Sequence, residues 1–189
     1  QMDHFCTCIR LLIIVCNSGL GHLKRVLHIL KYILQQNSVI EILIVVDQRK
    51  LAYFEKIIST KHFKKIAIKH LEADVFNYEN EMLIRYENEL LTADLVWSDN
   101  LLFPLKYNEN VFITGSFLWL DEIGGAFSNS EYALLDKARP TMIGCRYFAT
   151  SSVLEHTDFR GVGIYNYAAQ DLSLFGNGKN VLLASGNTT

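Results

Sequence analysis

The stretch that decides the fold of this chain is Asn17-Ser18-Gly19-Leu20-Gly21-His22-Leu23-Lys24-Arg25. An unbroken apolar run, 11–16, precedes it, and an amphipathic run, 23–34, continues from it. This order is typical of a buried strand, a glycine loop and a helix. Glycine lets a ligand approach the backbone closely, and the first turn of a helix offers unpaired N–H groups at the positive end of the helix dipole. The stretch therefore predicts a turn that can hold a phosphate group.

The turn also carries two side chains with their own chemistry, His22 and Arg25. They are three residues apart, so they share one face of the predicted helix. The dinucleotide-binding fingerprint would have a third glycine where this chain has Lys24, so that form is absent. A structural turn in which His22 and Arg25 are only solvated stays open at this point. The residues that we expect at a bound phosphate-containing ligand are Ser18, Gly19, Leu20, Gly21 and Arg25.

Strand and helix patterns alternate along the chain, which predicts a doubly wound, Rossmann-like α/β fold with a mostly parallel sheet. The predicted strands are 5–16, 40–46, 61–69, 95–97, 111–114, 141–150 and 161–164. The predicted helices are 22–36, 49–59, 79–91, 101–107 and 131–138, and Ser151-Ser152 would cap the segment that follows them. We expect the lysine-rich strand 61–69 near an edge of the sheet, and 70–78 as a loop. Right-handed crossovers would bring the loops after strands 11–16, 95–97 and 111–114 to one edge.

Two aspartates follow predicted strands, and each has two interpretations. Asp47 could hold a ribose hydroxyl, as in dinucleotide-binding folds, or cap the helix that follows it. We favour the cap, because the third glycine is missing. Asp99 could orient His22 as a carboxylate partner, fixing its tautomer and raising its basicity, or cap the helix predicted at 101–107. For Asp99 the sequence favours neither interpretation.

Polar and aromatic residues beside the same edge are candidates for a ligand pocket. Asn100 follows Asp99, and a glycine break at 115 opens an aromatic stretch. Such loops line acceptor pockets, but they are also ordinary core. The possible pocket residues are Asn100, Gly115, Ser116 and Trp119.

Composition excludes several functional classes. The 189 residues are 50% apolar and 20% charged with a net charge of −2, which is typical of a globular protein and lacks the basic excess of a nucleic-acid surface. No apolar run approaches the ~20 residues of a transmembrane segment. The N-terminus has no basic segment typical of a signal peptide, and the four cysteines have no metal-binding spacing. We therefore expect a cytoplasmic protein with reduced thiols and no metal.

The run Gly19-x-Gly21-His22-x-x-Arg25, set directly after the first strand, resembles the opening of two-domain GT-B sugar-nucleotide enzymes. The families that it resembles are the UDP-sugar hydrolase of pseudaminic acid synthesis and related glycosyltransferases, including the peptidoglycan N-acetylglucosaminyltransferase. Two other stretches are similar to parts of the same families. They are Asp94-Leu-Val-Trp-Ser-Asp99-Asn100 and the tail Asn180-Val-Leu-Leu-Ala-Ser-Gly186-Asn-Thr-Thr.

The resemblance implies an enzyme that acts on a nucleotide-activated sugar, in particular a UDP-sugar, without a metal or other cofactor. In these enzymes the second domain holds most of the nucleotide, and the first holds the sugar-containing acceptor. We accordingly expect 1–165 to be an N-terminal, acceptor-side domain, 166–179 a linker, and 180–189 the start of a nucleotide-binding domain otherwise absent from this chain. A C-terminal domain or a partner subunit would have to complete the enzyme.

Within this resemblance His22 is the candidate base that activates an acceptor hydroxyl or a water as the sugar–phosphate bond breaks. Its partner would be Asp99, and the glycine loop with Arg25 would stabilise the departing diphosphate. Arg25 points along the helix, so its alternative role is to tie the helix to the far side of the sheet. The His-x-x-Arg form resembles the hydrolase, but we favour glycosyl transfer, because more enzymes of this fold are transferases. A nucleotide-sugar hydrolase, a non-catalytic Rossmann-like subunit that needs a partner chain, and an NAD-type dehydrogenase domain are the alternatives.

Overall fold

The protein is described from a computed structural model, which places residues 8–36, 40–58, 66–115 and 125–162. These residues form one sheet of seven strands in the order β3-β2-β1-β4-β5-β6-β7, and each neighbouring pair is parallel. The strands are β1 (Ile9–Ile14), β2 (Ile40–Asp47), β3 (Ile66–Leu71), β4 (Leu95–Asp99), β5 (Val111–Thr114), β6 (Thr141–Cys145) and β7 (Asp158–Val162). The helices are α1 (Leu20–Gln36), α2 (Leu51–Ile58), α3 (Tyr78–Thr92), α5 (Gly125–Ala138) and α6 (Ser151–His156).

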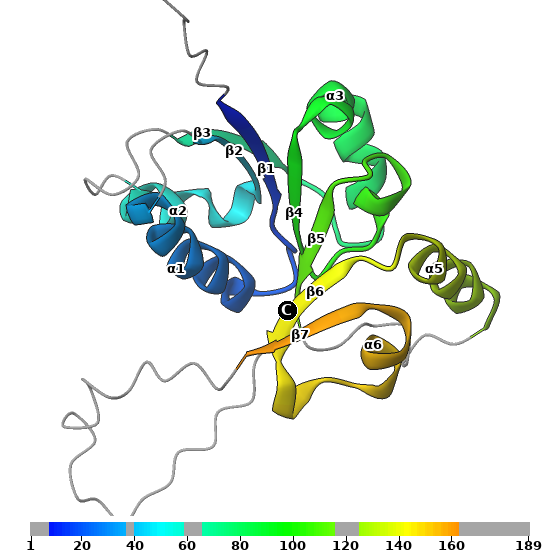
Figure 1. Cartoon of the computed structure of the whole chain (residues 1–189). Helices are drawn as coiled ribbons and strands as arrows, with labels where there is room; N and C mark the ends of the chain where they lie inside the picture. The colour runs from blue at the N-terminus through cyan, green and yellow to red at the C-terminus, as the bar shows by residue number, and fades with distance from the viewer. Residues whose placement is uncertain (1–7, 37–39, 59–65, 116–124, 163–189) are drawn as a thin grey trace, which may run out of the picture.

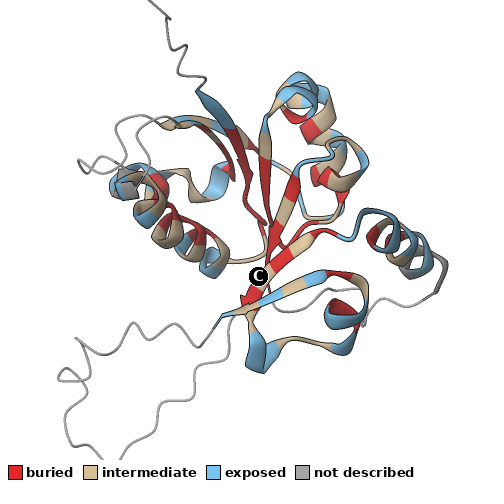
Figure 2. Cartoon of the chain, viewed as in Figure 1, coloured by how far each residue is buried: buried red, intermediate tan, exposed pale blue. Residues whose placement is uncertain are grey.

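Helices cover both faces of the sheet (Figure 1). Alternate residues of β1 point to opposite faces, because successive side chains of a strand do so. Leu11 and Ile13 pack with the apolar residues of α1 and with Phe54 of α2. Leu12 and Ile14 pack in a second cluster with apolar residues of α3, α5 and α6. Figure 2 shows the buried residues concentrated along the central strands, and the predicted doubly wound α/β fold is confirmed.

The strand order reverses between β1 and β4. From β1 the chain proceeds outward to β2 and β3, returns to the centre, and then proceeds from β4 to β7 on the other side. Leu12 is paired with Leu43 of β2 and with Val96 of β4. In open α/β sheets, ligands bind beyond the carboxyl ends of the strands at such a reversal. β3 lies at one edge of the sheet, as the lysine-rich sequence predicted.

Several predicted boundaries were wrong. Helix α1 begins at Leu20, so the glycine loop is shorter than expected, and β3 extends to Leu71 into a segment predicted as loop. The helix predicted at 101–107 is only a 3-10 turn, Phe103–Lys106, with Pro104 in its first turn. Strand β6 ends at Cys145, and a 3-10 turn, Arg146–Phe148, replaces the rest of the predicted strand.

Further along the chain, α5 begins at Gly125 rather than at 131, and β7 (Asp158–Val162) begins at Asp158 rather than at 161. The N-cap of α6 is Thr150, without a side-chain cap bond, rather than the serines that follow it. The expected linker at 166–179 and the expected start of a second domain at 180–189 lie outside the described residues. In the described part of the chain, no helix is both long and apolar enough to cross a membrane.

Candidate functional site

The carboxyl ends of β1, β4 and β5 lie side by side at the point where the strand order reverses. β1 leads into the glycine loop and α1, β4 ends at Asp99, and β5 ends at Thr114. Asp99 is directly paired with Thr114 in the register of the two strands. The topology therefore places the start of α1 beside both residues, although they are distant in the sequence.

His22 and Asp99 form a hydrogen-bonded pair. His22 Nδ1 lies 2.7 Å from Asp99 Oδ2, and the two side chains are 15% and 0% exposed. His22 lies in the first turn of α1, so its ring is held between a helix start and the end of a central strand. Of the two interpretations of Asp99, the structure shows the pairing with His22. Asp99 does not cap the 3-10 turn that follows, whose N-cap is Leu102.

The hydrogen bond assigns a tautomer to the imidazole. A carboxylate only accepts, so His22 Nδ1 carries the proton and donates it to Asp99. Arg25 Nη2 also lies 3.2 Å from Nδ1, but a guanidinium has no acceptor and a protonated Nδ1 has no free lone pair, so this contact is not a hydrogen bond. Nε2 is left as the ring nitrogen with a lone pair. The ring can therefore accept a proton there while Asp99 faces the positive charge that forms.

The second carboxylate oxygen of Asp99 is held by three donors. Arg25 donates to Oδ1 through Nη2 at 2.6 Å and through Nε at 3.2 Å. Thr114 Oγ1 donates to the same oxygen at 3.0 Å, and it accepts from Trp97 Nε1 at 2.9 Å. Trp97 is fully buried and stacks on Phe112 with 5.7 Å between the ring centroids. Arg25 thus balances the negative charge of the Asp99 carboxylate, and Thr114 of β5 helps to fix its orientation.

The guanidinium of Arg25 therefore does not lie where the sequence predicted it. As predicted, it shares a helix face with His22, but its guanidinium is bound to Asp99 rather than free at the glycine loop. Its side chain is 42% exposed, so part of it still faces solvent beside the site. The role that the sequence assigned to Arg25, stabilising a diphosphate, stays a prediction.

The glycine loop follows the carboxyl end of β1 and leads into α1. Gly19 has φ of 91°, a left-handed conformation that favours glycine, and its N–H donates to Asn17 O at 3.0 Å. Gly21 is exposed, and a Cβ on it would meet no atom within 4 Å. Leu20 is exposed as well, and Ser18 is half-buried. The backbone conformation therefore favours glycine at position 19 but not at position 21. The surface at Gly21 is open to a ligand.

Lys50, in the connection between β2 and α2, binds the glycine loop. Its Nζ donates to Asn17 O at 2.6 Å and to Gly19 O at 2.8 Å. Burial lowers the pKa of Lys50, which the charge of Asp47 only partly opposes. Sequence reasoning missed Lys50, since no local pattern connects it with a loop more than thirty positions away. It missed Thr114 too, although the aligned ends of two parallel strands would have placed that residue beside Asp99.

Asp47 is a capping residue. Its Oδ1 accepts from Arg49 N at 2.9 Å, and both carboxylate oxygens accept from Arg49 Nε at 3.0 Å. Burial raises its pKa, but the hydrogen bonds and the charge of Arg49 outweigh that effect and the pKa of Asp47 is lowered. The favoured interpretation, a helix cap, is confirmed for the 3-10 turn Gln48–Lys50 that leads into α2. A carboxylate engaged in this way does not suit the ribose contact of the NAD-type alternative.

Two of the four expected pocket residues can be located, Asn100 and Gly115. Asn100 has φ of 59° and is 5% exposed, and its carboxamide has no hydrogen-bond partner in the described part of the chain. A Cβ on Gly115 would lie 2.5 Å from Asn100 Oδ1, so the side-chain amide of Asn100 packs directly against Gly115. Both residues lie next to Asp99 and Thr114. Ser116 and Trp119 lie outside the described residues, and an acceptor pocket stays a prediction.

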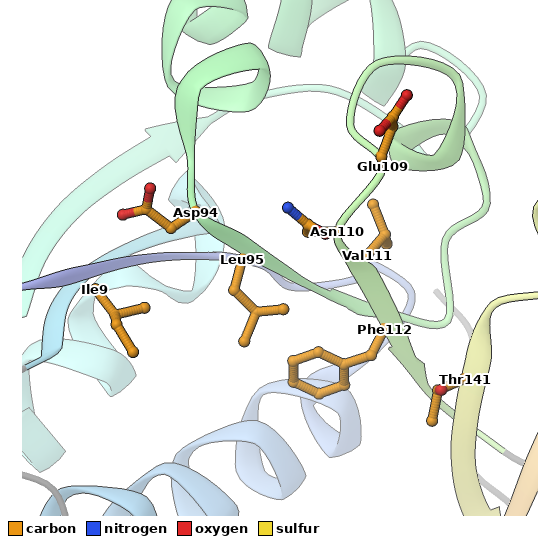
Figure 3. Close-up of a pocket in the computed structure, with 8 residues that line it drawn as sticks. All are labelled: Ile9, Asp94, Leu95, Glu109, Asn110, Val111, Phe112 and Thr141. Atoms are coloured by element: carbon orange, nitrogen blue, oxygen red, sulfur yellow. The ribbon is translucent and has the colours of Figure 1, made fainter.

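An open depression of about 500 Å³ lies elsewhere, at the amino ends of the strands (Figure 3). Its lining includes Ile9 and Leu95 at the starts of β1 and β4, with Asp94 and Glu109 at its margin. Arg10 donates to Asp94 Oδ2 through its backbone N–H at 2.8 Å. This edge is opposite to that of His22, so the depression is separate from the candidate site. No group of three or more potential metal ligands occurs among the described residues.

Comparison with known proteins gives similarity in structure only. No protein-family model matches the sequence, and no curated protein is significantly similar to it. The crystal structure of Glycyrrhiza uralensis UGT73P12, complexed with glycyrrhetinic acid 3-O-monoglucuronide, is similar with a TM-score of 0.54 and 8% sequence identity. The similarity covers 85% of this chain and 49% of that chain, so this chain spans about half the length of that protein.

A short-chain dehydrogenase/reductase (wide type) from Veillonella parvula DSM 2008, in complex with NADP, is similar with a TM-score of 0.41 and 12% identity. The similarity covers 73% of this chain and 68% of that one, but a TM-score this low supports no inference. The similarity to UGT73P12, a GT-B UDP-glycosyltransferase, shows the fold alone. The chain has a glycosyltransferase-like, Rossmann-type α/β fold.

Proposed function

We propose that this chain is the N-terminal, acceptor-side half of a GT-B enzyme that transfers a sugar from a nucleotide-activated donor, a UDP-sugar, to an acceptor hydroxyl. The observation that carries the proposal is the pair of His22 and Asp99, 2.7 Å apart at the carboxyl end of the sheet. The pair lies where α/β folds bind ligands, and it leaves one imidazole nitrogen able to accept a proton. The glycosyltransferase-like fold supports the same reaction class.

In the proposed reaction His22 Nε2 takes the proton of the acceptor hydroxyl. The acceptor oxygen forms a bond to the anomeric carbon, the bond from that carbon to the diphosphate oxygen breaks, and the diphosphate leaves with the electron pair. Asp99 keeps the imidazole in the required tautomer and faces the imidazolium that forms. The exposed N–H groups at the start of α1, after Gly19, are suited to the negative charge of the diphosphate. These steps need no metal or redox cofactor.

The remaining parts of the enzyme are proposed from the same fold. The similar structure is about twice as long as the matched region, so a second α/β domain, or a partner subunit in its place, would supply most of the nucleotide site. A hydrolase would use the same base on a water instead of an acceptor hydroxyl. A non-catalytic subunit would bind the ligand without turnover.

The test compares the complete wild-type protein with His22→Ala and with His28→Ala as a matched control on the same helix. Each is incubated with UDP-sugars, with and without a panel of sugar and aglycone acceptors, and nucleotide release is followed. We expect release that depends on an acceptor and falls by about 10²–10⁴-fold in His22→Ala but not in His28→Ala. Release without any acceptor would identify a hydrolase. Turnover unchanged by His22→Ala, with the fold intact, would rule out His22 as the base. Ligand binding without turnover would identify a binding subunit.

A further inference from the structure

We infer that Lys50 is a positioning residue for the candidate site, whose ammonium fixes the glycine loop and thereby the first turn of α1 that carries His22. The structural basis is the pair of hydrogen bonds from Nζ to Asn17 O at 2.6 Å and to Gly19 O at 2.8 Å. Gly19 immediately precedes the first residue of α1. A single side chain thus holds the loop at both of its ends.

The loop has few other supports among the described residues. Gly19 N–H donates to Asn17 O within the loop, and Asn17 Nδ2 donates to the carbonyl oxygen of Ala73 in the connection after β3. The Ser18 backbone also hydrogen-bonds to the Cys16 side chain. The bond to Ala73 holds Asn17 but not the residues next to the helix. Gly19 has a left-handed conformation and no side chain of its own to restrain the backbone. Lys50 is therefore the side chain that anchors the loop at the start of α1.

The ammonium is directed to these carbonyls and not to a carboxylate. In the described part of the chain Lys50 forms no ion pair, because the carboxylate of the nearby Asp47 is occupied by Arg49. Charge-assisted hydrogen bonds are stronger than neutral ones, so a cation on two carbonyl oxygens restrains the loop more than a neutral donor would. Small displacements of a catalytic group have large effects on rate. The rate consequence rests on the proposed function, but the restraint on the loop does not.

The experiment uses the complete protein, labelled with ¹⁵N-glycine, as wild type, Lys50→Met, Lys50→Arg and Lys137→Met. Methionine keeps the length and apolar character of the side chain without its donors, arginine restores a cationic donor, and Lys137→Met controls for the loss of an exposed lysine on α5. We expect Lys50→Met to shift or broaden the amide signals of Gly19 and Gly21 and to lower kcat about tenfold with a smaller effect on KM. Lys50→Arg should restore much of both, and Lys137→Met should change neither.

Each outcome bears on the inference. Unchanged signals of Gly19 and Gly21 in folded Lys50→Met would overturn it. Shifted signals in a protein whose wild type shows no turnover would support the restraint on the loop and count against the proposed function alone. If Lys50→Met does not fold, the ammonium signal of Lys50 decides, observed in wild type labelled with ¹⁵N-lysine and identified by its absence in Lys50→Arg. Slow exchange of its protons would support the two hydrogen bonds, and a freely exchanging ammonium would contradict them.

Discussion

His22 Nδ1 lies 2.7 Å from Asp99 Oδ2, although 77 positions separate the two residues in the chain. The distance is a consequence of the sheet order, because β1 and β4 are neighbours and their carboxyl ends meet at one edge. The buried side of the pair is completed by Thr114, whose hydroxyl connects Asp99 to Trp97. The geometry of the base thus depends on residues that cannot themselves touch a ligand, and they can be varied separately.

Thr114→Val should lower turnover without removing the base. The substitution keeps the shape of the side chain but removes the donor to Asp99 Oδ1 and the acceptor of Trp97 Nε1. Because Trp97 is fully buried, its N–H would be left unpaired, at a cost of about 1–3 kcal/mol in the free energy of unfolding. We expect kcat to fall by roughly tenfold, as for other outer hydrogen-bond partners of a site. Urea unfolding and nucleotide release measure the two effects.

Thr114→Ser is the control for this prediction. Serine restores the hydroxyl, so stability and turnover should both return toward the wild-type values. A Thr114→Val protein with wild-type kcat would show that the hydroxyl does not orient Asp99.

Gly19 of the loop and Gly21 of α1 should change the stability in opposite directions when each is replaced by alanine. Gly19→Ala places a Cβ on a residue with φ of 91° and should destabilise the protein by roughly 1–2 kcal/mol. Gly21→Ala lies in the first turn of α1 with free space around its Cβ, and alanine favours helix by about 0.5–1 kcal/mol. Thermal unfolding checks both changes.

Gly21 also tests whether the start of α1 holds the ligand. A methyl group on this exposed residue would occupy the surface from which a diphosphate would approach the helix N–H groups. We expect Gly21→Ala to unfold at a higher temperature and yet to bind UDP more weakly in calorimetry. Unchanged UDP affinity in this variant would place the nucleotide elsewhere.

Stability near Asp47 should depend on pH in the acid range. The pKa of Asp47 is lowered in the folded state, where Arg49 binds the carboxylate, so its ionised form contributes stability above the unfolded pKa of about 3.9. That stability is lost as the pH falls through the lower, folded pKa. The Arg49 side chain is 64% exposed, so the pair contributes no more than about 1 kcal/mol.

Asp47→Asn should therefore be less stable than wild type at pH 7, and the difference should shrink as the pH falls below about 4 and disappear below the folded pKa of Asp47. Asparagine keeps an acceptor for the cap, so Asp47→Ala should lose a further ~1 kcal/mol at both pH values. Urea unfolding at pH 7 and pH 3 measures the differences. A gap between Asp47→Asn and wild type that is equal at both pH values would show that the charge contributes nothing.

Periodicity in the sequence was enough to predict the fold. The runs at 11–16 and 42–46 are apolar on both faces, as a central parallel strand requires. The predictions that failed are those in which local pattern was ambiguous. Leu20 and Gly21 resemble loop in sequence but lie in α1, because a helix tolerates glycine in its exposed first turn. The alternating stretch after Cys145 resembles a strand, yet Tyr147 and Phe148 are exposed in a turn.

From the sequence, only those residues of the candidate site that follow the predicted strands could be predicted. His22 and Asp99 each follow a strand, so the topology alone brings them near each other. The contacts of Lys50 with the loop and of Thr114 with Asp99 depend on the packing of separate connections, which no local spacing records. The same applies to Arg25, whose guanidinium lies on Asp99 because that carboxylate is buried and needs a counter-charge.

Asp99→Asn offers the sharpest test of the pair, because it preserves shape and changes only the chemistry. Asparagine can turn its amide N–H toward His22 Nδ1, which would then accept rather than donate, and the proton would move to Nε2. A ring protonated on Nε2 cannot take a proton from an acceptor hydroxyl. We expect kcat to fall on the order of 10²–10⁴-fold, comparable with loss of the base itself. The ¹⁵N shifts of the His22 ring report the tautomer directly, and a rate that falls while Nδ1 keeps its proton would show that Asp99 acts through its charge on the imidazolium instead.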